Sequence, residues 1–213
     1  MRKSALNLII AAVAMFTVSV ASAQNKKVLE PEMVFVQGND TMNSFNIGKY
    51  PITQGEWKSV MGKNPSKFAD GDNYPVEQVS WNDAQKFIKK LNARTGKNYR
   101  LPTEAEWKYA AGGGNKSRGY EYSGSNNIDD VAWYYDNSGG YSHPVGTKSP
   151  NELGIYDMSG NVCEWCQDWY IGSFRAALGG SWSNYASYCL VANRLGNNPD
   201  ARDNDFGFRV VLQ

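Results

Sequence analysis

The stretch PNELGIYDMSGNVCEW, residues 150–165, decides how this chain folds. It leads from turn-forming residues into VCEWCQDWY, an apparent strand, and a glycine-containing turn separates Asp157 from Glu164. From Gly113 onward the helical period disappears, and short β-rich pieces alternate with Gly, Asn, Ser and Pro turns. These pieces are VAWYY, HPVGT, VCEWCQDWY, ALGGSW and FGFRVVL. The sequence therefore predicts a late half that is rich in loops.

The earlier half carries helices with clear ends. One helix begins after Ser80, an N-cap with Asp83 three residues on, and stops at Gly96. A second begins after Thr103, which forms a capping box with Glu106. Their buried faces are predicted to consist of Ala84, Phe87, Ile88 and Leu91 in the first and of Trp107, Ala110 and Ala111 in the second.

Upstream of these two helices, the pattern predicts two strands and a shorter helix. MVFVQG, residues 33–38, alternates and ends in glycine, and a second strand ends near Tyr50. A helix from about Thr53 is closed by Gly62. Together with the loop-rich half, these elements predict an irregular α+β domain.

The N-terminus has the pattern of a secretory signal peptide. Arg2 and Lys3 precede an apolar run from Leu6 to Val20, and Ala21-Ser22-Ala23 supplies a cleavage site, so residues 1–23 are predicted to be removed. The 22 basic residues less Arg2 and Lys3 leave 20 against 21 acidic residues, a net charge of −1. That balance does not attract nucleic acid or anionic lipid. We expect an exported protein, periplasmic or extracellular, without membrane insertion after cleavage, with a flexible lead-in at 24–32 and one domain at 33–213.

Six segments, taken in order, resemble motifs of the formylglycine-generating enzyme family, also called sulfatase-modifying factor. They are YPITQGEW, PVEQVSWNDA, YRLPTEAEWKYAAGGG, PNELGIYDMSGNVCEW, GGSW and GFRVV, and the resemblance spans residues 33–213. It implies a C-type-lectin-like fold of the formylglycine-generating enzyme type. In this fold two helices pack on irregular antiparallel strands, and bound calcium stabilises the loops.

In the enzymes of this family, two cysteines shortly after the GGS turn bind copper and oxidise a substrate cysteine. The resemblance places the second of them at Cys189 and the first at Asn184. Two thiolates suit Cu(I), and a neutral amide does not replace one of them. No catalytic residue is therefore predicted. Cys189 would be catalytic only under the alternative that the protein is a copper-dependent oxidase of protein cysteine or a related periplasmic oxidative tailoring enzyme.

The three cysteines favour a structural role in an oxidising compartment. In CEWC the odd spacing along a strand directs Cys163 and Cys166 to opposite faces, which does not suit a redox pair. A disulfide between Cys166 and Cys189 is predicted, and pairing of Cys163 with Cys189 is the alternative.

YDMSGNVCEW resembles the calcium loop of the family. The resemblance implies a structural calcium ion held by side-chain oxygens of Asp157 and Glu164 and by backbone carbonyls of Gly160 and Val162. The alternative is an acidic turn held by hydrogen bonds.

Four other polar side chains are expected to be structural. His143 lies in a loop without a nucleophile motif. Arg100, Arg194 and Arg209 are expected to pair with carboxylates or carbonyls.

The last segment mixes framework residues with positions that share no period and no chemistry. It resembles the variable proteins that retroelements diversify at adenines, whose fold is the same; ordinary loop variety is the alternative. We expect these positions to form a ligand-binding surface, with aromatic anchors such as Tyr185 and Phe206. The predicted ligand-binding residues are Trp182, Ser183, Asn184, Tyr185, Leu190, Leu195, Gly196, Ala201, Asp203, Asn204, Asp205 and Phe206.

The sequence thus predicts an exported, non-catalytic domain of the sulfatase-modifying-factor family that binds a protein or surface ligand. The alternatives are the oxidase and a structural component of the cell surface. Copper is expected only for the oxidase.

Overall fold

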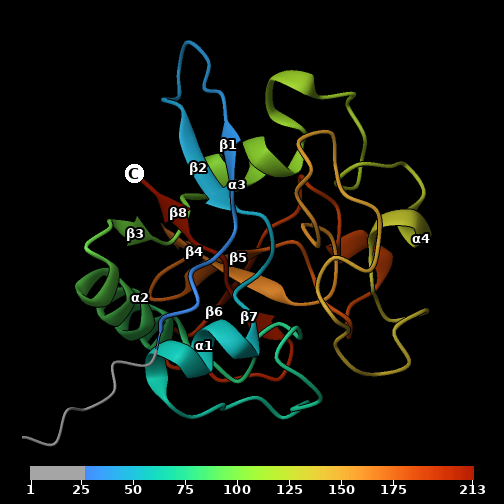
Figure 1. The fold of residues 1–213 in the computed structure, drawn as a ribbon. Coiled ribbons are helices and arrows are strands. Elements are labelled where there is room, and N and C mark those ends of the chain that lie inside the picture. The colour runs from blue at the N-terminus through green and yellow to red at the C-terminus, as the bar shows by residue number, and fades with distance from the viewer. Residues whose placement is uncertain (1–26) are drawn as a thin grey trace, which may run out of the picture.

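The structure, a computed structural model, describes residues 27–213 (Figure 1). The predicted signal peptide at 1–23 lies outside the described residues, as do residues 24–26 of the predicted lead-in. Within residues 27–213, no helix is both long enough and apolar enough to cross a bilayer.

Two four-stranded sheets form the framework. The first has the order β1-β2-β8-β3, with every neighbouring pair antiparallel. The second has the order β6-β5-β4-β7, and its β4–β7 pair is parallel, with Cys163 opposite Phe206. The prediction of antiparallel strands is therefore wrong for this pair. The strands are β1 (Met33–Val36), β2 (Phe45–Gly48), β3 (Tyr99–Arg100), β4 (Cys163–Trp169), β5 (Arg175–Leu178), β6 (Leu195–Asn197), β7 (Phe206–Gly207) and β8 (Val211–Leu212).

The three longer helices agree with the sequence pattern. Helix α1 (Gln54–Met61) starts at Thr53, α2 (Trp81–Thr95) at Ser80 and α3 (Glu104–Ala111) at Thr103, each with a complete capping box. The predicted faces are buried in both helices: Ala84, Phe87, Ile88 and Leu91 in α2, and Trp107, Ala110 and Ala111 in α3. The described residues also contain a one-turn helix, α4 (Ile128–Val131), and two 3-10 helices, η1 (Gly114–Lys116) and η2 (Ala186–Tyr188).

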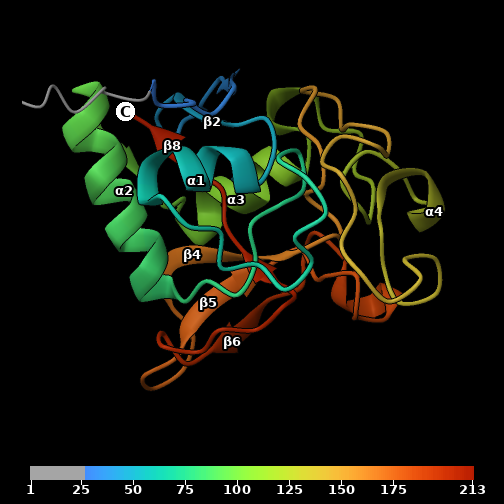
Figure 2. The same ribbon diagram turned by 60° about the horizontal axis from the view of Figure 1, so that its bottom comes forward.

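The core lies between the sheets and the longer helices. Strand β4 is buried on both of its faces: Cys163 and Trp165 pack in one hydrophobic cluster with residues of α2, and Cys166 packs in another with residues of α3. The loop-rich region around α4 lies on the opposite side of the molecule from α2 (Figures 1 and 2). The core therefore leaves that side free of long secondary-structure elements.

Two local expectations are wrong. VAWYY, residues 131–135, includes the end of α4 and a turn, and HPVGT, residues 143–147, is a loop without strand pairing. The described part of the predicted lead-in, residues 27–32, makes contacts with the domain. The backbone N–H of Leu29 donates to Ser59 Oγ, and Glu30 accepts a hydrogen bond from Tyr99 Oη at 2.9 Å. Side chains of the domain satisfy these polar groups, so residues 27–32 follow its surface.

Candidate functional site

The candidate site is built on the turn Gly179-Gly180-Ser181-Trp182, which follows β5. Gly179 and Gly180 both have positive φ, at 89° and 65°. A Cβ at Gly180 would lie 2.8 Å from Cys189 Sγ, so only glycine fits between the turn and that thiol. The glycines thus turn the chain sharply and bring Ser181 and Trp182 to the loop-rich side.

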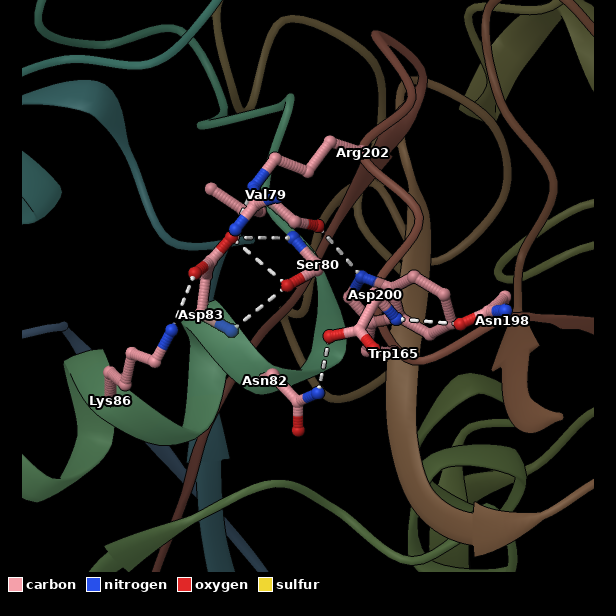
Figure 3. Close-up of polar contacts among 9 residues, drawn as sticks. All are labelled: Val79, Ser80, Asn82, Asp83, Lys86, Trp165, Asn198, Asp200 and Arg202. Atoms are coloured by element: carbon pink, nitrogen blue, oxygen red, sulfur yellow. Dashed lines mark hydrogen bonds and ion pairs between the residues drawn. The ribbon is translucent and has the colours of Figure 1, made fainter. Parts of the chain in front are cut away.

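Hydrogen bonds fix the segment 197–206 beside this turn. Figure 3 shows its anchor on the first turn of α2, where Asn82 Nδ2 donates to Asp200 Oδ1 at 2.7 Å and Arg202 Nε donates to Asp83 Oδ2 at 2.6 Å. Burial alone would raise the pKa of Asp83, but hydrogen bonds from Arg202 and Ser80 lower it to about 2. A carboxylate that is ionised throughout the physiological range therefore holds this loop.

A second loop, residues 132–141, closes over the first. The backbone N–H of Tyr135 donates to Asn184 O at 2.9 Å, and Ser138 Oγ donates to Trp182 O at 2.8 Å. The rings of Tyr135 and Tyr185 meet at 4.9 Å between centroids. These contacts join the 132–141 loop to the 181–190 loop, although nearly 50 residues separate them in sequence.

Four tyrosines on these two loops are exposed. Their exposed fractions are 56% for Tyr135, 44% for Tyr141, 60% for Tyr185 and 43% for Tyr188. The loops read WYYDNSGGY at 133–141 and SWSNYASY at 181–188, and antibody contact loops have a similar richness in Tyr, Ser, Gly and Asn. Sequence reasoning missed the 132–141 loop, and this composition is the signal that could have identified it.

Between the two loops lies an open pocket of about 530 Å³, which we call the tyrosine pocket. It is lined by Tyr135, Asp136, Ser138, Trp182 and Ser183, together with the Gly139-Gly140 pair. Two of these lining residues, Trp182 and Ser183, belong to the predicted ligand-binding set. The Asp136 carboxylate makes no hydrogen bond or ion pair with any residue in 27–213.

A polar network lies next to the pocket. Asp205 Oδ2 accepts hydrogen bonds from Ser183 Oγ at 2.7 Å and Ser181 Oγ at 3.0 Å. Ser181 Oγ also lies 2.9 Å from Asn184 Oδ1. Trp182 Nε1 donates to Asn204 O, which fixes the indole ring. The structure therefore brings together Trp182, Ser183, Asn184, Tyr185, Asn204 and Asp205 from the predicted ligand-binding set.

Other members of that set lie elsewhere. Phe206 packs against the Trp165 ring at 4.9 Å and contacts the core. Leu195 and Gly196 are in β6, the edge strand beside β5, and a Cβ at Gly196 would lie 2.2 Å from Tyr170. Phe206 is therefore not the exposed anchor that the sequence suggested. The structure places Ala201 and Asp203 in the loop after β6, where Asp203 accepts from Asn197, and Leu190 near the end of the 181–190 loop, half-buried.

Cys189 is not available for chemistry in this arrangement. Its side chain is fully buried against Val131, Ala132 and Tyr134, and burial raises the pKa of its thiol to about 12. The side chain at the other copper position, Asn184, points its amide oxygen at the Ser181 hydroxyl. A buried, protonated thiol and a neutral amide do not fit a Cu(I) ion that prefers two thiolates. The residues at the two copper positions therefore do not suit the copper site of the family's enzymes.

The predicted disulfide between Cys166 and Cys189 is absent, and so is the alternative bond to Cys163. All three cysteines have free, buried thiols. Cys166 and Cys189 lie in different hydrophobic clusters, because Cys166 faces the α3 side of β4 whereas Cys189 packs beside α4. The expectation that the two cysteines of CEWC face opposite ways is confirmed, since Cys163 and Cys166 also fall in different clusters.

One of the predicted calcium ligands, Glu164, pairs with an arginine. Both oxygens of Glu164 accept hydrogen bonds from the fully buried Arg209 guanidinium at 2.6 Å, and Glu164 Oε2 also accepts from Trp107 Nε1. Asp157 Oδ2 accepts from the backbone N–H of Gly146, and burial raises the pKa of Asp157 to about 6. Glu164, with both oxygens already engaged, does not fit a Ca²⁺ ligand in this arrangement. Calcium binding through Asp157, Gly160, Val162 and Glu164 stays a prediction from the resemblance.

The sequence also predicts structural roles for Arg100, Arg194 and His143. Arg100 pairs with Glu106 and Arg194 with Glu104, as expected for arginines that bond carboxylates. His143 stacks on the Trp133 ring at 3.8 Å, and its Nε2 lies 2.8 Å from Ser138 O. His143 therefore supports the 132–141 loop.

The chain matches the sulfatase-modifying factor enzyme 1-like domain family over residues 15–213. It is 35% identical to a chaperone protein LppX of Paenibacillus barcinonensis, with 99% of each chain covered. It is 36% identical to a formylglycine-generating enzyme of Streptomyces coelicolor over 73% of this chain and 57% of that enzyme.

Among solved structures, variable protein 1 of Treponema denticola superposes with a TM-score of 0.76 at 30% identity, covering 86% of this chain and 93% of that one. The predicted fold class, a loop-rich α+β fold of the C-type-lectin-like, formylglycine-generating enzyme type, is confirmed by such matches.

Proposed function

Because the chain belongs to the sulfatase-modifying factor enzyme 1-like family, we propose that it is a ligand-binding member of this family that does not oxidise cysteine. One observation carries the proposal: two loops rich in exposed tyrosine meet around an open pocket, while the thiol at the copper position is buried. Tyrosine supplies a large amphipathic contact area at a low cost in conformational entropy, which suits a binding surface.

The ligand is a protein in this proposal. The relative that matches over its full length carries the name chaperone, which favours a polypeptide partner. The formylglycine-generating enzyme, of which the chain covers 57%, is the basis of the alternative function, oxidation of protein cysteine. We further propose that the protein is exported, as its first 23 residues predict.

The function is tested by selecting binders from a random 12-residue peptide library on the wild-type protein and on Tyr185→Ala. Peptides that bind the wild type and lose affinity for the variant support the proposal. Tyr120→Ala is the matched control, because Tyr120 belongs to neither the 132–141 loop nor the 181–190 loop.

Two measurements address the oxidase. Titration with Cu(I) in competition with a chromogenic chelator should show no tight stoichiometric site, and an oxygen electrode should record no uptake with a cysteine-containing peptide. Tight Cu(I) binding that is lost in Cys189→Ser, with oxygen uptake, would overturn the non-catalytic proposal.

The likeness to variable protein 1 supports a further part of the proposal, that retroelement diversification acts on variable positions between Ser183 and Phe206. A second, near-identical copy of the final coding segment that differs only at adenines, beside a reverse transcriptase gene, is the expected observation. Absence of both from the gene's neighbourhood would refute it.

A further inference from the structure

The lining of the tyrosine pocket is aromatic and acidic. It combines Tyr135 and Trp182 with the unpaired carboxylate of Asp136, and it contains no Lys, Arg or His. Lys67 lies over the Phe68 ring, and that ring packs edge-on against Trp182, but Lys67 does not line the pocket. An aromatic face beside a carboxylate attracts a cation through both the ring quadrupole and the charge.

The adjacent polar network centres on the Asp205 carboxylate. The single hydroxyl proton of Ser181 faces two acceptors, Asn184 Oδ1 and Asp205 Oδ2. The hydroxyl of Ser183 donates to the same Asp205 oxygen. An ionised carboxylate offers about four lone-pair positions, so Asp205 retains capacity to accept further hydrogen bonds.

An orphaned oxygen lies behind this network. Glu77 is fully buried, and while its Oε1 accepts from the backbone N–H of Phe68 at 2.8 Å, its Oε2 has no partner among the described residues. Glu77 thus positions the loop whose Phe68 ring supports Trp182. Buried polar atoms normally have partners, so this unpaired oxygen marks an incompletely satisfied polar region behind the network.

We propose that the tyrosine pocket recognises a cationic side chain, the guanidinium or ammonium group of an exposed basic segment on a protein partner. The group lies against the Tyr135 and Trp182 rings and donates hydrogen bonds to Asp136, with the Asp205 network as the neighbouring acceptor. This inference rests on the proposed ligand-binding function and names the chemistry of its ligand.

The probe is again the random 12-residue peptide library, and the selected peptides are resynthesised with citrulline in place of arginine. Citrulline keeps the shape of arginine and removes its charge. Binding of each pair is measured by fluorescence anisotropy to the wild type, to Asp136→Asn and to Asp40→Asn. Asp40 is an exposed carboxylate in the turn between β1 and β2, outside the pocket, and serves as the matched control.

Selected peptides should be enriched in Arg or Lys, and citrulline should weaken binding to the wild type about tenfold, the size of a charge-assisted contact beside an aromatic ring. Asp136→Asn should weaken binding of the arginine peptide about tenfold as well but leave the citrulline peptide almost unchanged, because the two changes remove one interaction. Asp40→Asn should have no effect. Equal melting temperatures of the variants confirm that folding is unaffected.

Neutral or acidic selected peptides that lose affinity for Tyr185→Ala would overturn the inference and leave the binding function intact. The same holds for carbohydrate bound on a glycan array in a Tyr185-dependent manner. An Asp136→Asn effect that is equal for arginine and citrulline peptides would also overturn it. If neither peptide nor glycan binds through the two loops, the inference and the proposed function both fail.

Discussion

Replacing Arg209 with methionine should remove the main polar support of the core beneath the loop-rich side. The guanidinium is fully buried and makes four hydrogen bonds, two to the Glu164 carboxylate, one to Gly48 O and one to Tyr156 O. These acceptors come from β2, β4 and the loop before β4, so Arg209 joins the two sheets. Methionine fills much of the volume but donates no hydrogen bond.

The expected loss of stability depends on the buried charge that the substitution leaves without its partner. In Arg209→Met the buried Glu164 carboxylate keeps, among residues 27–213, only the Trp107 indole N–H as a hydrogen-bond partner. Removing one member of a buried, hydrogen-bonded ion pair costs about 4 kcal/mol, because the remaining charge is uncompensated. That is a large part of the roughly 5–15 kcal/mol that stabilises a typical domain.

Urea unfolding followed by tryptophan fluorescence measures the effect. With a slope of about 2 kcal/mol per molar urea, the midpoint should fall by about 2 M. Arg100→Met is the matched control, since Arg100 also makes two hydrogen bonds to one carboxylate, that of Glu106, but is partly exposed. Its loss should cost only about 1 kcal/mol because solvent screens the remaining charge.

A loss of under about 1 kcal/mol in Arg209→Met would refute the reasoning. If in addition the chelator EDTA strongly destabilised the wild type, a calcium ion rather than Arg209 would be the partner of Glu164. The double variant Glu164→Leu/Arg209→Met provides a further check, because replacing both charges by apolar side chains should recover most of the lost stability.

Three further predictions concern the site and its supports. Burial raises the folded-state pKa of Glu77 from the usual 4.5 to about 7, so the folded protein binds this proton more tightly and loses stability as the pH rises from 4.5 to 7. The variant Glu77→Gln should therefore have a higher urea midpoint than the wild type at pH 8 and a similar midpoint at pH 5. Equal shifts of the midpoint at both pH values would contradict this prediction. Because all three cysteines are buried and the pKa of Cys189 is raised to about 12, dithionitrobenzoate should label none of them in the native protein at pH 7.5 but all three in urea, and a promptly reacting native thiol would contradict the structure. Gly180→Ala should destabilise the protein by about 3 kcal/mol in thermal unfolding, because the residue has a positive φ and its new Cβ would clash with Cys189. The control Gly62→Ala, which has a positive φ but no atom within 4 Å of the new Cβ, should cost about 1 kcal/mol. Equal losses of stability would show that the clash does not matter.

Tyr185 and Phe206 differ in a way that the sequence did not predict. Both are aromatic residues at irregular positions of the last segment, and both were expected to be exposed anchors. Tyr185 is exposed, whereas Phe206 packs on Trp165 because β7 pairs with β4 in parallel. That pairing joins residues far apart in the chain, so no local pattern predicts it.

Contacts between residues far apart in the chain also explain why only part of the site was predicted. The motifs around GGSW predicted Trp182 and Ser183, but Tyr135 and Asp136 join them only through the hydrogen bond from Tyr135 to Asn184 O. The absent disulfide has a similar origin. Cysteine spacing allowed Cys166 to reach Cys189, and the packing of β4 placed them in different clusters.

The sequence by itself determined the helices, their capped ends and the family of the fold, because capping boxes, apolar periodicity and ordered motifs act over a few residues or persist as short segments. Only the tertiary structure decided which loops meet, which aromatic rings stay in water and which partner Glu164 takes, because contacts between distant segments depend on the packing of the whole core.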